Sequence, residues 1–418
     1  MNKKYTVATL GCRTNQYETQ AFRDQLEAMG YVLAKDGEQA ELCIVNTCTV
    51  TENADKDSRA QIRKLAAKHP GSKLVVTGCS ADNRPDEIAQ LPGVSKVVRN
   101  ALKDDLVKDL FPEFEVPKFA IRQFEAHTRA FVKVQDGCNS FCTYCIIPYT
   151  RGRSRSRTVK EVVEEVKGLI SNGYKEVVLT GINVGDFDGG SEKARLVDLI
   201  KEVDALPGLE RLRLSSIDPD EVDEDLASAI VNGKNTCHSM HIVLQSGSNA
   251  ILKRMNRKYT RQMFIDTCQY LISRCPDFTF TTDIIVGFPG ETERDFEDTL
   301  EMMKQTRFAN VHMFPYSKRD RTRAALYPNE VPHHIMQQRK ALLLKEAEAL
   351  SFSLRNDYVG QEATILVENR KTKENKVFGH TSNFLPVWIP DCSLESNQTV
   401  KVRLIDNLAD GLVGEIII

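Results

Sequence analysis

The chain has 418 residues, of which 41% are hydrophobic and 27% charged, and its formal net charge is −2. This is the composition of an ordinary globular protein of two to four domains. It excludes a general polyanion binder, so a nucleic-acid surface would have to be local. No apolar run approaches the roughly 18 residues of a membrane span, so we expect a cytoplasmic protein. In that compartment eleven cysteines, an odd number, indicate ligands or catalysts instead of disulfides.

Residues 1–112 alternate short apolar runs with amphipathic stretches. This alternation predicts a doubly wound α/β domain, in which a parallel sheet is covered by helices on both faces. Residues 113–130 combine proline, charge and little periodicity, which is typical of a linker. The expected strands are 5–10, 42–46 and 73–77, and the expected helices are 15–29 and 53–69.

A longer series of strand and helix patterns fills residues 131–354. Six such units are too few for an eight-unit barrel and predict a partial (β/α)6 barrel. A long helical pattern at 331–357 ends the series. The expected strands are 131–135, 176–180, 211–214, 240–244, 278–286 and 308–314, with helices such as 159–170 and 291–306 between them.

Residues 355–418 change to short strand patterns, which predict a small β-barrel. This segment has seven Lys and Arg residues against nine Asp and Glu residues, so it is not a basic domain. RNA binding would need one face of it, and the alternative role is packing against the rest of the protein. The expected strands are 363–368, 375–380, 385–389, 399–406 and 411–418. The candidate RNA face is Arg370, Lys371, Lys373 and Lys376 with Phe378, Phe384 and Trp388.

Three cysteines, Cys138, Cys142 and Cys145, form a C-x3-C-x2-C pattern directly after the first strand of the predicted barrel; we call them the compact trio. Thiolates are the usual protein ligands of iron–sulfur clusters, and three of them leave one iron of a four-iron cluster open for a small molecule. A zinc site would need a fourth partner, which does not follow at finger or ribbon spacing. Tyr144, between the last two cysteines, is either a ligand contact or a packing aromatic.

Three further cysteines, Cys12, Cys48 and Cys79, each follow a predicted strand of the N-terminal sheet; we call them the strand-end trio. The carboxyl ends of parallel strands meet at one edge of a sheet, so these thiols are expected to converge. Gly11 and Gly78 precede two of them and permit tight turns or close approach of a cofactor. The alternative is three unrelated buried thiols, since free cysteine is common in protein cores.

The remaining cysteines are weaker candidates. Cys237 lies beside His238 and near His241, which is a faint indication of a third metal site, although the two histidines straddle the start of a predicted strand. Cys43 lies inside a predicted strand and is expected in the core. The cysteines without ligand-like neighbours are Cys268, Cys275 and Cys392.

The compact trio after a first barrel strand resembles the radical S-adenosylmethionine superfamily, and further segments sharpen this to its methylthiotransferase family. The resemblance covers nearly the whole chain and is highly specific. Within the family, three segments are most similar to the branch acting on N6-threonylcarbamoyladenosine in tRNA. At Arg321 the chain departs from the family, which usually has Gly at this position. The departure concerns the backbone geometry of the local loop and not the chemistry. The family segments are 10–19, 46–50, 77–79, 137–157, 244–248 and 287–292, and the branch segments are 15–19, 215–219 and 314–319.

The resemblance implies an enzyme that methylthiolates C2 of N6-threonylcarbamoyladenosine at position 37 of tRNA, next to the anticodon. It implies two [4Fe-4S] clusters. The cluster on the compact trio cleaves S-adenosylmethionine to a 5′-deoxyadenosyl radical, and the one on the strand-end trio carries the sulfur. S-adenosylmethionine is used twice per product, and these cofactors supply the hard chemistry while the protein positions them.

The resemblance also assigns the domains and partners. Residues 1–112 become the methylthiotransferase domain with the auxiliary cluster, 131–354 the radical S-adenosylmethionine domain, and 355–418 an OB-like, RNA-binding TRAM domain. The implied partners are the modified tRNA and an electron donor such as flavodoxin or ferredoxin, with the protein a monomer.

Further cofactor candidates lie at or near the ends of later barrel strands, where barrel sites are built. Four arginines at alternate positions after the compact trio, and a second basic run, suit phosphate contacts; the alternative for both is a solvated loop. The cofactor candidates are Tyr144, Gly181, Asn183, Ser216, Gln245 and Asp283. The RNA-binding candidates are Arg151, Arg153, Arg155, Arg157, Lys318 and Arg319.

Two other functions stay open. A sister methylthiotransferase would act on isopentenyladenosine in tRNA or on a ribosomal-protein side chain. A non-catalytic iron–sulfur or RNA-binding protein is disfavoured, because ordinary ferredoxin clusters are fully ligated by protein, whereas each trio supplies three thiolates.

Overall fold

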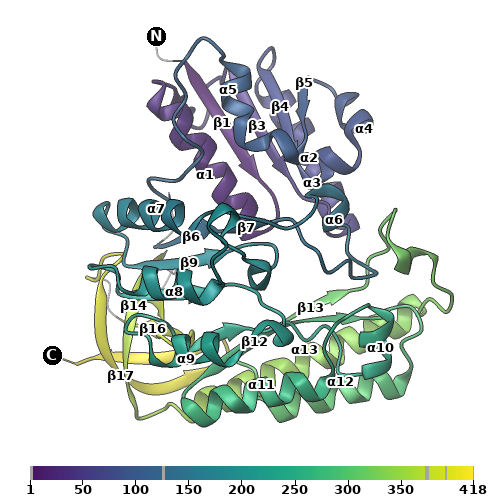
Figure 1. Ribbon diagram of the computed structural model, residues 1–418, viewed down its shortest axis with the longest axis vertical. Coiled ribbons are helices and arrows are strands. Elements are labelled where there is room, and N and C mark those ends of the chain that lie inside the picture. The colour runs from purple at the N-terminus through teal and green to yellow at the C-terminus, as the bar shows by residue number, and fades with distance from the viewer. Residues whose placement is uncertain (1–2, 125–127, 372–375, 391–392, 418) are drawn as a thin grey trace.

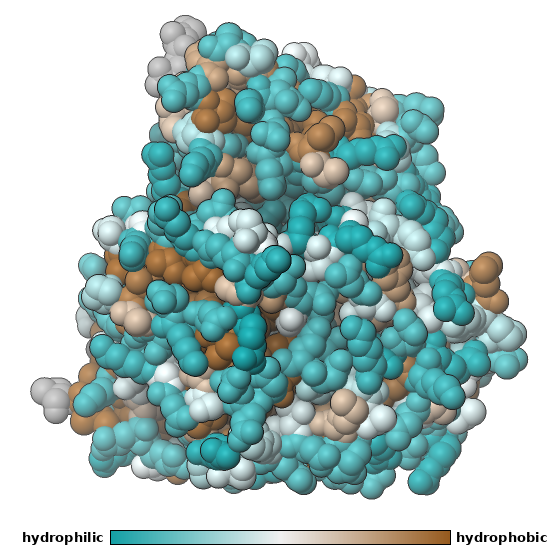
Figure 2. Space-filling view, in the orientation of Figure 1, coloured by the Kyte–Doolittle hydropathy of each residue, from teal (hydrophilic) through white to brown (hydrophobic). Residues whose placement is uncertain are grey.

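The computed structural model describes residues 3–124, 128–371, 376–390 and 393–417. Figure 1 shows the N-terminal sheet domain at the top, the barrel below it, and the C-terminal β-barrel beside the barrel at the lower left. Among the described residues, every helix is too short or too polar to cross a bilayer. The face shown in Figure 2 is largely hydrophilic.

The N-terminal domain is built on a five-stranded sheet. Its elements are β1 (Lys4–Thr9), α1 (Arg13–Ala28), β2 (Val32–Leu33), β3 (Leu42–Thr47), α2 (Glu52–Lys68), β4 (Lys73–Gly78), α3 (Cys79–Asn83), α4 (Pro85–Ala89), β5 (Val94–Val98) and α5 (Leu106–Leu110). The order is β2-β1-β3-β4-β5, and all neighbours run parallel. One core lies between the sheet and α1 with α5, and another lies between the opposite face and α2. Helices cover both faces, which confirms the doubly wound prediction.

The edge strands β2 and β5 are missing from the predicted elements. β2 has two residues, neither of them buried, and β5 is buried only at its last residue, with Ser95 and Lys96 exposed. A strand that is half exposed lacks the continuous apolar run by which the three central strands are recognised.

The central domain is an open barrel of six parallel strands. They are β6 (Arg129–Lys133), β9 (Glu176–Thr180), β10 (Arg211–Leu214), β11 (Ser239–His241), β12 (Thr279–Val286) and β13 (Asn310–Pro315). The main helices between them are α7 (Val159–Ser171), α8 (Leu196–Asp204), α9 (Glu224–Asn232), α10 (Asn249–Arg254), α11 (Arg261–Arg274) and α12 (Glu293–Thr306). Two three-stranded sheets, β10-β9-β6 and β11-β12-β13, are joined by the parallel bridges Leu212 to Thr236 and Ile217 to Ile242. The partial barrel is confirmed.

β11 is shorter than its predicted range of 240–244. The chain leaves regular pairing after His241 and touches neighbouring strands only through single bridges at Ile242 and Gln245. Gln245 has a backbone φ of +63°, which residues other than glycine adopt rarely and which prevents the strand from resuming at that point. This irregular end carries residues that line the site described below.

The segment between α5 and β6 is packed against both neighbouring domains. Val116 joins the core around α1 and α5, and Ile121 and Phe124 join the barrel core, while Phe119 contacts both cores. Tyr17 and Ala21 of α1 are also part of the barrel core. The two domains therefore share apolar packing along α1 and this segment, in addition to the covalent connection.

The C-terminal module follows the long helix α13 (His333–Asn356). Its strands β14 (Glu362–Lys371), β15 (Val377–His380), β16 (Pro386–Ile389), β17 (Thr399–Leu408) and β18 (Gly411–Ile416) close in the order β14-β15-β16-β18-β17. The predicted small barrel is confirmed. Figure 1 shows it beside the central domain.

The aromatic residues expected on an RNA-binding face are used for packing. Phe384 lies between the guanidinium groups of Arg129 and Arg213, at 5.2 and 4.9 Å from its ring centre, and stacks on His380. Phe378 and Trp388 are buried and contact each other. Burial removes Phe378 and Trp388 from an RNA-binding face, and Phe384 is used to dock the module on Arg129 and Arg213. Of its basic residues, Lys373 lies outside the described residues, as do the side chains of Arg370 and Lys371.

Candidate active site: two trios of cysteines around one cavity

The compact trio lies on a loop closed by a short hairpin. The strands β7 (Gln135–Asp136) and β8 (Arg155–Ser156) pair antiparallel, with Gln135 opposite Ser156. Gly137 has a φ of +72°, and a Cβ there would overlap the carbonyl oxygen of Arg153, so the loop crosses itself at a position only glycine fits. The backbone N–H of Cys145 donates to the carbonyl of Cys142 (3.0 Å), which forms a tight turn between two of the ligands.

Polar groups surround the compact trio. The backbone N–H of Ser140 donates to Sγ of Cys138 (3.4 Å), and Nη1 of Arg257 donates to Sγ of Cys142 (2.8 Å). Burial raises the pKa of the three thiols, while the Arg257 charge opposes this at Cys142. Binding of iron has to displace these thiol protons, and Arg257 favours the resulting thiolate.

The strand-end trio converges as expected. Cys12 precedes α1, Cys48 follows β3, and Cys79 begins α3 directly after β4. Gly11 has a φ of +91°, and a Cβ there would lie 2.7 Å from Sγ of Cys48, so glycine lets the first loop approach the second. Burial raises the pKa of Cys12 and brings that of Cys48 to about 12, and the proximity of Cys79 raises both.

Both trios fit iron–sulfur clusters by their donor chemistry. Each gathers three sulfur donors from glycine-containing loops at the carboxyl ends of parallel strands, and three thiolates ligate three irons of a four-iron cluster. The donor sets of both trios therefore fit such clusters, including the strand-end trio, whose members are far apart in sequence.

One cavity of about 570 Å³ is lined by Cys12 of the strand-end trio together with all three cysteines of the compact trio. It lies at the carboxyl ends of the barrel strands, where barrel active sites are built. The residues proposed from the sequence as cofactor contacts all line it; they are Tyr144, Gly181, Asn183, Ser216, Gln245 and Asp283.

Several of these residues are held in place by neighbours. Oε1 of Gln135 accepts from the backbone N–H groups of Ile182 and Asn183 (both 3.0 Å), and a Cβ at Gly181 would lie 2.8 Å from the same oxygen. The Asn183 amide donates to Glu221 (2.7 Å). The turn after β9 is thus fixed in a shape that brings backbone to the cavity wall.

Sequence reasoning missed other residues that line the cavity. Asp218 and Phe314 belong to the branch segments, so the resemblance could have indicated them. Arg257 lies in none of the matched segments, and no sequence pattern around it predicts that it lines the cavity. The other missed residues include three with basic or imidazole side chains, Arg13, His241 and His312.

Two of the arginines expected to bind RNA are buried. Arg151 forms ion pairs with Glu18 (2.9 Å) and Asp136 (2.8 Å), and its side chain is 0% exposed. Arg319 is paired with Asp55 and is likewise buried. Burial removes Arg151 and Arg319 from the candidates for RNA contact, because neither can reach a phosphate without breaking a buried pair.

The other basic candidates differ in exposure. Arg157 is mostly buried beside Glu165, Arg155 is half exposed and pairs with Asp136 (2.9 Å), and Lys318 is exposed and pairs with Glu330 (2.7 Å). Arg153 is exposed and lies over the ring of Phe141 (4.3 Å). The accessible members are therefore Arg153, Arg155 and Lys318.

Arg151 belongs to a buried charge network that joins the two ligand regions. Glu18 of α1 also pairs with Lys103 (2.7 Å) and Lys133 (3.4 Å). Against the effect of burial, Arg151 and Lys103 hold the pKa of Glu18 well below its usual value. The carboxylate of Glu18 is thus ionised and bridges the helix that follows Cys12 to the loop of the compact trio.

Replacing Arg151 with methionine is expected to destabilise the protein by about 3–5 kcal/mol, because it leaves buried carboxylates unpaired. Urea unfolding measures this. The control is Arg155→Gln, which removes the exposed partner of Asp136 and should cost less than about 1 kcal/mol. Equal effects of the two substitutions would contradict the importance of the buried network.

An open barrel with a three-cysteine loop after its first strand defines the class of radical S-adenosylmethionine enzymes, and the Radical SAM superfamily matches residues 132–303. Solved structures support the fold. The radical S-adenosylmethionine methyltransferase TsrM from Kitasatospora setae, with cobalamin and a [4Fe-4S] cluster bound, superposes with a TM-score of 0.56 over 75% of each chain at 14% identity.

The chain belongs to the methylthiotransferase family of that class. Residues 4–99 match Uncharacterized protein family UPF0004. The chain is 45% identical to threonylcarbamoyladenosine tRNA methylthiotransferase MtaB of Chlamydia pneumoniae, covering 99% of this chain and 98% of that one. It is 35% identical to MtaB of Bacillus subtilis (strain 168), covering 96% and 94%. It is also 35% identical to tRNA-2-methylthio-N(6)-dimethylallyladenosine synthase of Alkaliphilus oremlandii (strain OhILAs), covering 100% and 93%. The family indicated by the motifs is confirmed.

Proposed function

We propose that the protein methylthiolates C2 of N6-threonylcarbamoyladenosine at position 37 of tRNA, giving 2-methylthio-N6-threonylcarbamoyladenosine. The observation that carries this proposal is the single cavity onto which Cys12 and the compact trio both open. A base in that cavity would lie between a radical source and a sulfur source. The similarity to proteins named threonylcarbamoyladenosine tRNA methylthiotransferase supports the choice of nucleoside.

In this proposal each trio holds one [4Fe-4S] cluster. The compact trio, Cys138, Cys142 and Cys145, ligates one, and the strand-end trio, Cys12, Cys48 and Cys79, ligates the second. When bound, the clusters and S-adenosylmethionine supply the 5′-deoxyadenosyl radical and the methylthio group.

The chain's own residues bind and orient the reactants. Tyr144, Gly181, Asn183, Ser216, Gln245 and Asp283 contact S-adenosylmethionine from the cavity wall. Arg257 stabilises negative charge on the Cys142 sulfur, with which it is in contact.

The accessible basic residues Arg153, Arg155 and Lys318 are proposed to contact tRNA phosphates, which position a nucleic acid without reading its bases. The proposed N-terminal domain is residues 1–112, the linker 113–130, the radical S-adenosylmethionine domain 131–354 and the TRAM domain 355–418.

The proposed protein acts in the cytoplasm as a monomer, and a flavodoxin or ferredoxin supplies its electrons.

The nucleoside profile of tRNA, from cells with and without the gene, tests substrate and reaction together. Loss of the gene should remove 2-methylthio-N6-threonylcarbamoyladenosine and leave N6-threonylcarbamoyladenosine in its place. An unchanged level of the methylthio nucleoside would refute the assignment. Loss of 2-methylthio-isopentenyladenosine instead would identify a sister enzyme, to which the chain is also similar.

A further inference from the structure

The cavity is lined by two arginines whose situations differ. Arg257 is engaged by Cys142 and Asp218. Arg13, the first residue of α1, lies over the ring of Phe131 with 5.5 Å between the guanidinium carbon and the ring centre. Within the described part of the chain, no carboxylate lies within ion-pair distance of Arg13. Arg13 therefore lines the cavity beside Cys12 without a direct ion pair, and Asp283, the acidic group whose charge acts on it, is itself paired with His241.

The surroundings of Arg13 suit a small anionic group. Arg13 and His241 line both the main cavity and a smaller one, of about 60 Å³, that continues towards the barrel interior. The rings of His241 and His312 lie 5.7 Å apart, and Asp283 is paired with His241 (3.3 Å). A guanidinium offers parallel N–H donors that match a carboxylate, and the side chain of Arg13 is exposed at the cavity, where a ligand can reach it.

We propose that Arg13 binds the carboxylate of the threonylcarbamoyl group, with His241 and His312 beside it. The inference rests on the proposed function, because that group ends in a carboxylate whereas a dimethylallyl group is a hydrocarbon. Arg13 thereby selects the threonylcarbamoyl nucleoside and holds its N6 substituent near Cys12.

A double-mutant cycle, in which one change is made in the protein and the other in the substrate, tests this contact. Wild type and Arg13→Gln are assayed on an anticodon stem-loop carrying N6-threonylcarbamoyladenosine and on the same RNA with the carboxylate converted to its methylamide. Wild type should lose roughly 30-fold or more in kcat/KM on the amide, the loss expected when a close guanidinium–carboxylate pair between protein and substrate is removed. Arg13→Gln should lose a similar factor in kcat/KM on the acid RNA, relative to wild type, and should react with the two RNAs at nearly equal kcat/KM. Arg13→Lys should retain part of the discrimination.

The controls separate the possible failures. Arg63→Gln removes an exposed arginine of α2 and should discriminate as wild type does. Iron content and thermal unfolding establish that each variant is folded. An equal loss on both RNAs in Arg13→Gln, or no loss on either, overturns the role of Arg13. If wild type fails to methylthiolate the acid RNA, it is the proposed function that fails.

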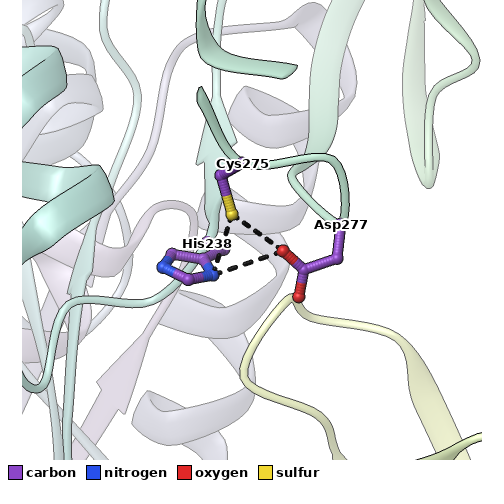
Figure 3. Close-up of side chains that lie close together, drawn as sticks. All are labelled: His238, Cys275 and Asp277. Carbon is purple, nitrogen blue, oxygen red and sulfur yellow. Dashed lines mark hydrogen bonds and ion pairs between the residues drawn. The ribbon is translucent and has the colours of Figure 1, made fainter. Parts of the chain in front are cut away.

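A second, independent cluster lies at the opposite ends of the barrel strands, where β11 and β12 begin. His238 precedes β11, and Cys275 and Asp277 form the turn between α11 and β12. The distances are 3.1 Å from Nδ1 of His238 to Sγ of Cys275, 2.8 Å from that sulfur to Oδ1 of Asp277, and 3.4 Å from Nδ1 to the same oxygen. Figure 3 shows the three side chains pointing toward one another.

This geometry differs from the faint metal signal in the sequence. Cys237 and His241 take no part; His241 lines the other cavity instead. Cys275, for which sequence reasoning recognised no ligand-like neighbour, joins with Asp277 because the α11–β12 turn brings both residues to His238. The same imidazole nitrogen faces both the sulfur and the carboxylate, so the three atoms converge on one point, unlike a proton relay, in which the two ring nitrogens serve different partners.

We infer that His238, Cys275 and Asp277 bind a zinc-class divalent cation, with water in the fourth position. Nitrogen, thiolate and carboxylate donors are the set that zinc prefers. Binding releases the proton of the Cys275 thiol. The carbonyl of Asp277 accepts from Asn383 (3.0 Å) and Tyr358 (3.3 Å), so the ion would stiffen the turn on which the C-terminal barrel docks.

Zinc content and zinc-edge X-ray absorption of the iron-loaded protein, incubated with one equivalent of zinc chloride and desalted, test the site. We expect one zinc per chain, with one sulfur among its ligands, and its loss in His238→Ala and in Cys275→Ala. Cys268→Ala, a buried cysteine of the same helix region, should keep the zinc. Absence of zinc in wild type, a zinc with three sulfur ligands as in an empty cluster site, or zinc retained in both variants would overturn the inference.

Discussion

Replacing Cys142 with alanine is expected to abolish formation of 5′-deoxyadenosine from S-adenosylmethionine. The substitution leaves two thiols on a loop whose three sulfurs form one ligand set, and a four-iron cluster with two of its irons unligated by protein is not held. Cys142 is also the sulfur that Arg257 contacts, so that guanidinium keeps only its pair with Asp218. Chromatography of the products after anaerobic reduction measures the effect, and methylthiolation should disappear with it.

The matched control is Cys268→Ala, since Cys268 is a buried thiol of the barrel core. It should retain both activities. Iron content gives a second readout: about eight irons per chain are expected for wild type and about four for Cys142→Ala, on the reading of two cysteine-ligated clusters. A Cys142→Ala protein that still forms 5′-deoxyadenosine would show that the compact trio has been assigned wrongly.

Replacing Cys48 with alanine is expected to stop methylthiolation while S-adenosylmethionine is still cleaved. Cys48 lies next to Gly11 and near Cys79, within the strand-end trio, and does not line the cavity beside the compact trio. Its loss should therefore remove one cluster and leave the other. The measurement compares 5′-deoxyadenosine with methylthiolated nucleoside in the same reaction.

Cys43→Ala is the control for Cys48, because both thiols lie on or directly after β3, and Cys43 faces the core and contacts Ser72 instead of the trio. It should keep the product ratio of wild type. Methylthiolation that survives in Cys48→Ala would rule out the sulfur-carrying role of the strand-end trio, whereas loss of both activities would mean that the two sites are not separable.

The sequence predicts the placement of the cysteines well, because two general rules are enough. Closely spaced thiols share a loop, and residues that follow parallel strands share a sheet edge. The second rule alone is enough to predict that Cys12, Cys48 and Cys79 lie close together. The strands β6, β9 and β12 are predictable for a further reason, since strands that are buried on both faces have largely continuous apolar runs.

The fate of the charged residues could not be predicted in this way. Arg151 lies in a run of alternating arginines and serines that is typical of a phosphate-binding loop, yet it is buried by Glu18, which is 133 residues away. Phe384 lies in a turn of a small barrel and is enclosed by Arg129 and Arg213 of another domain. In both cases a distant partner decides whether the side chain faces solvent, and local pattern carries no information about that partner.

The network around Glu18 has a consequence for how a nucleotide enters. Arg151, Lys103 and Lys133 all converge on this one carboxylate, and Tyr17 of the same helix is packed in the barrel core. The helix α1, which follows Cys12, is therefore fixed to the barrel by ion pairs and apolar packing. It cannot move away from the barrel to open the cavity. The adaptation must come from the RNA: the target base has to rotate out of the stacked anticodon loop, and the enzyme is expected to favour nucleotides whose unstacking is cheap.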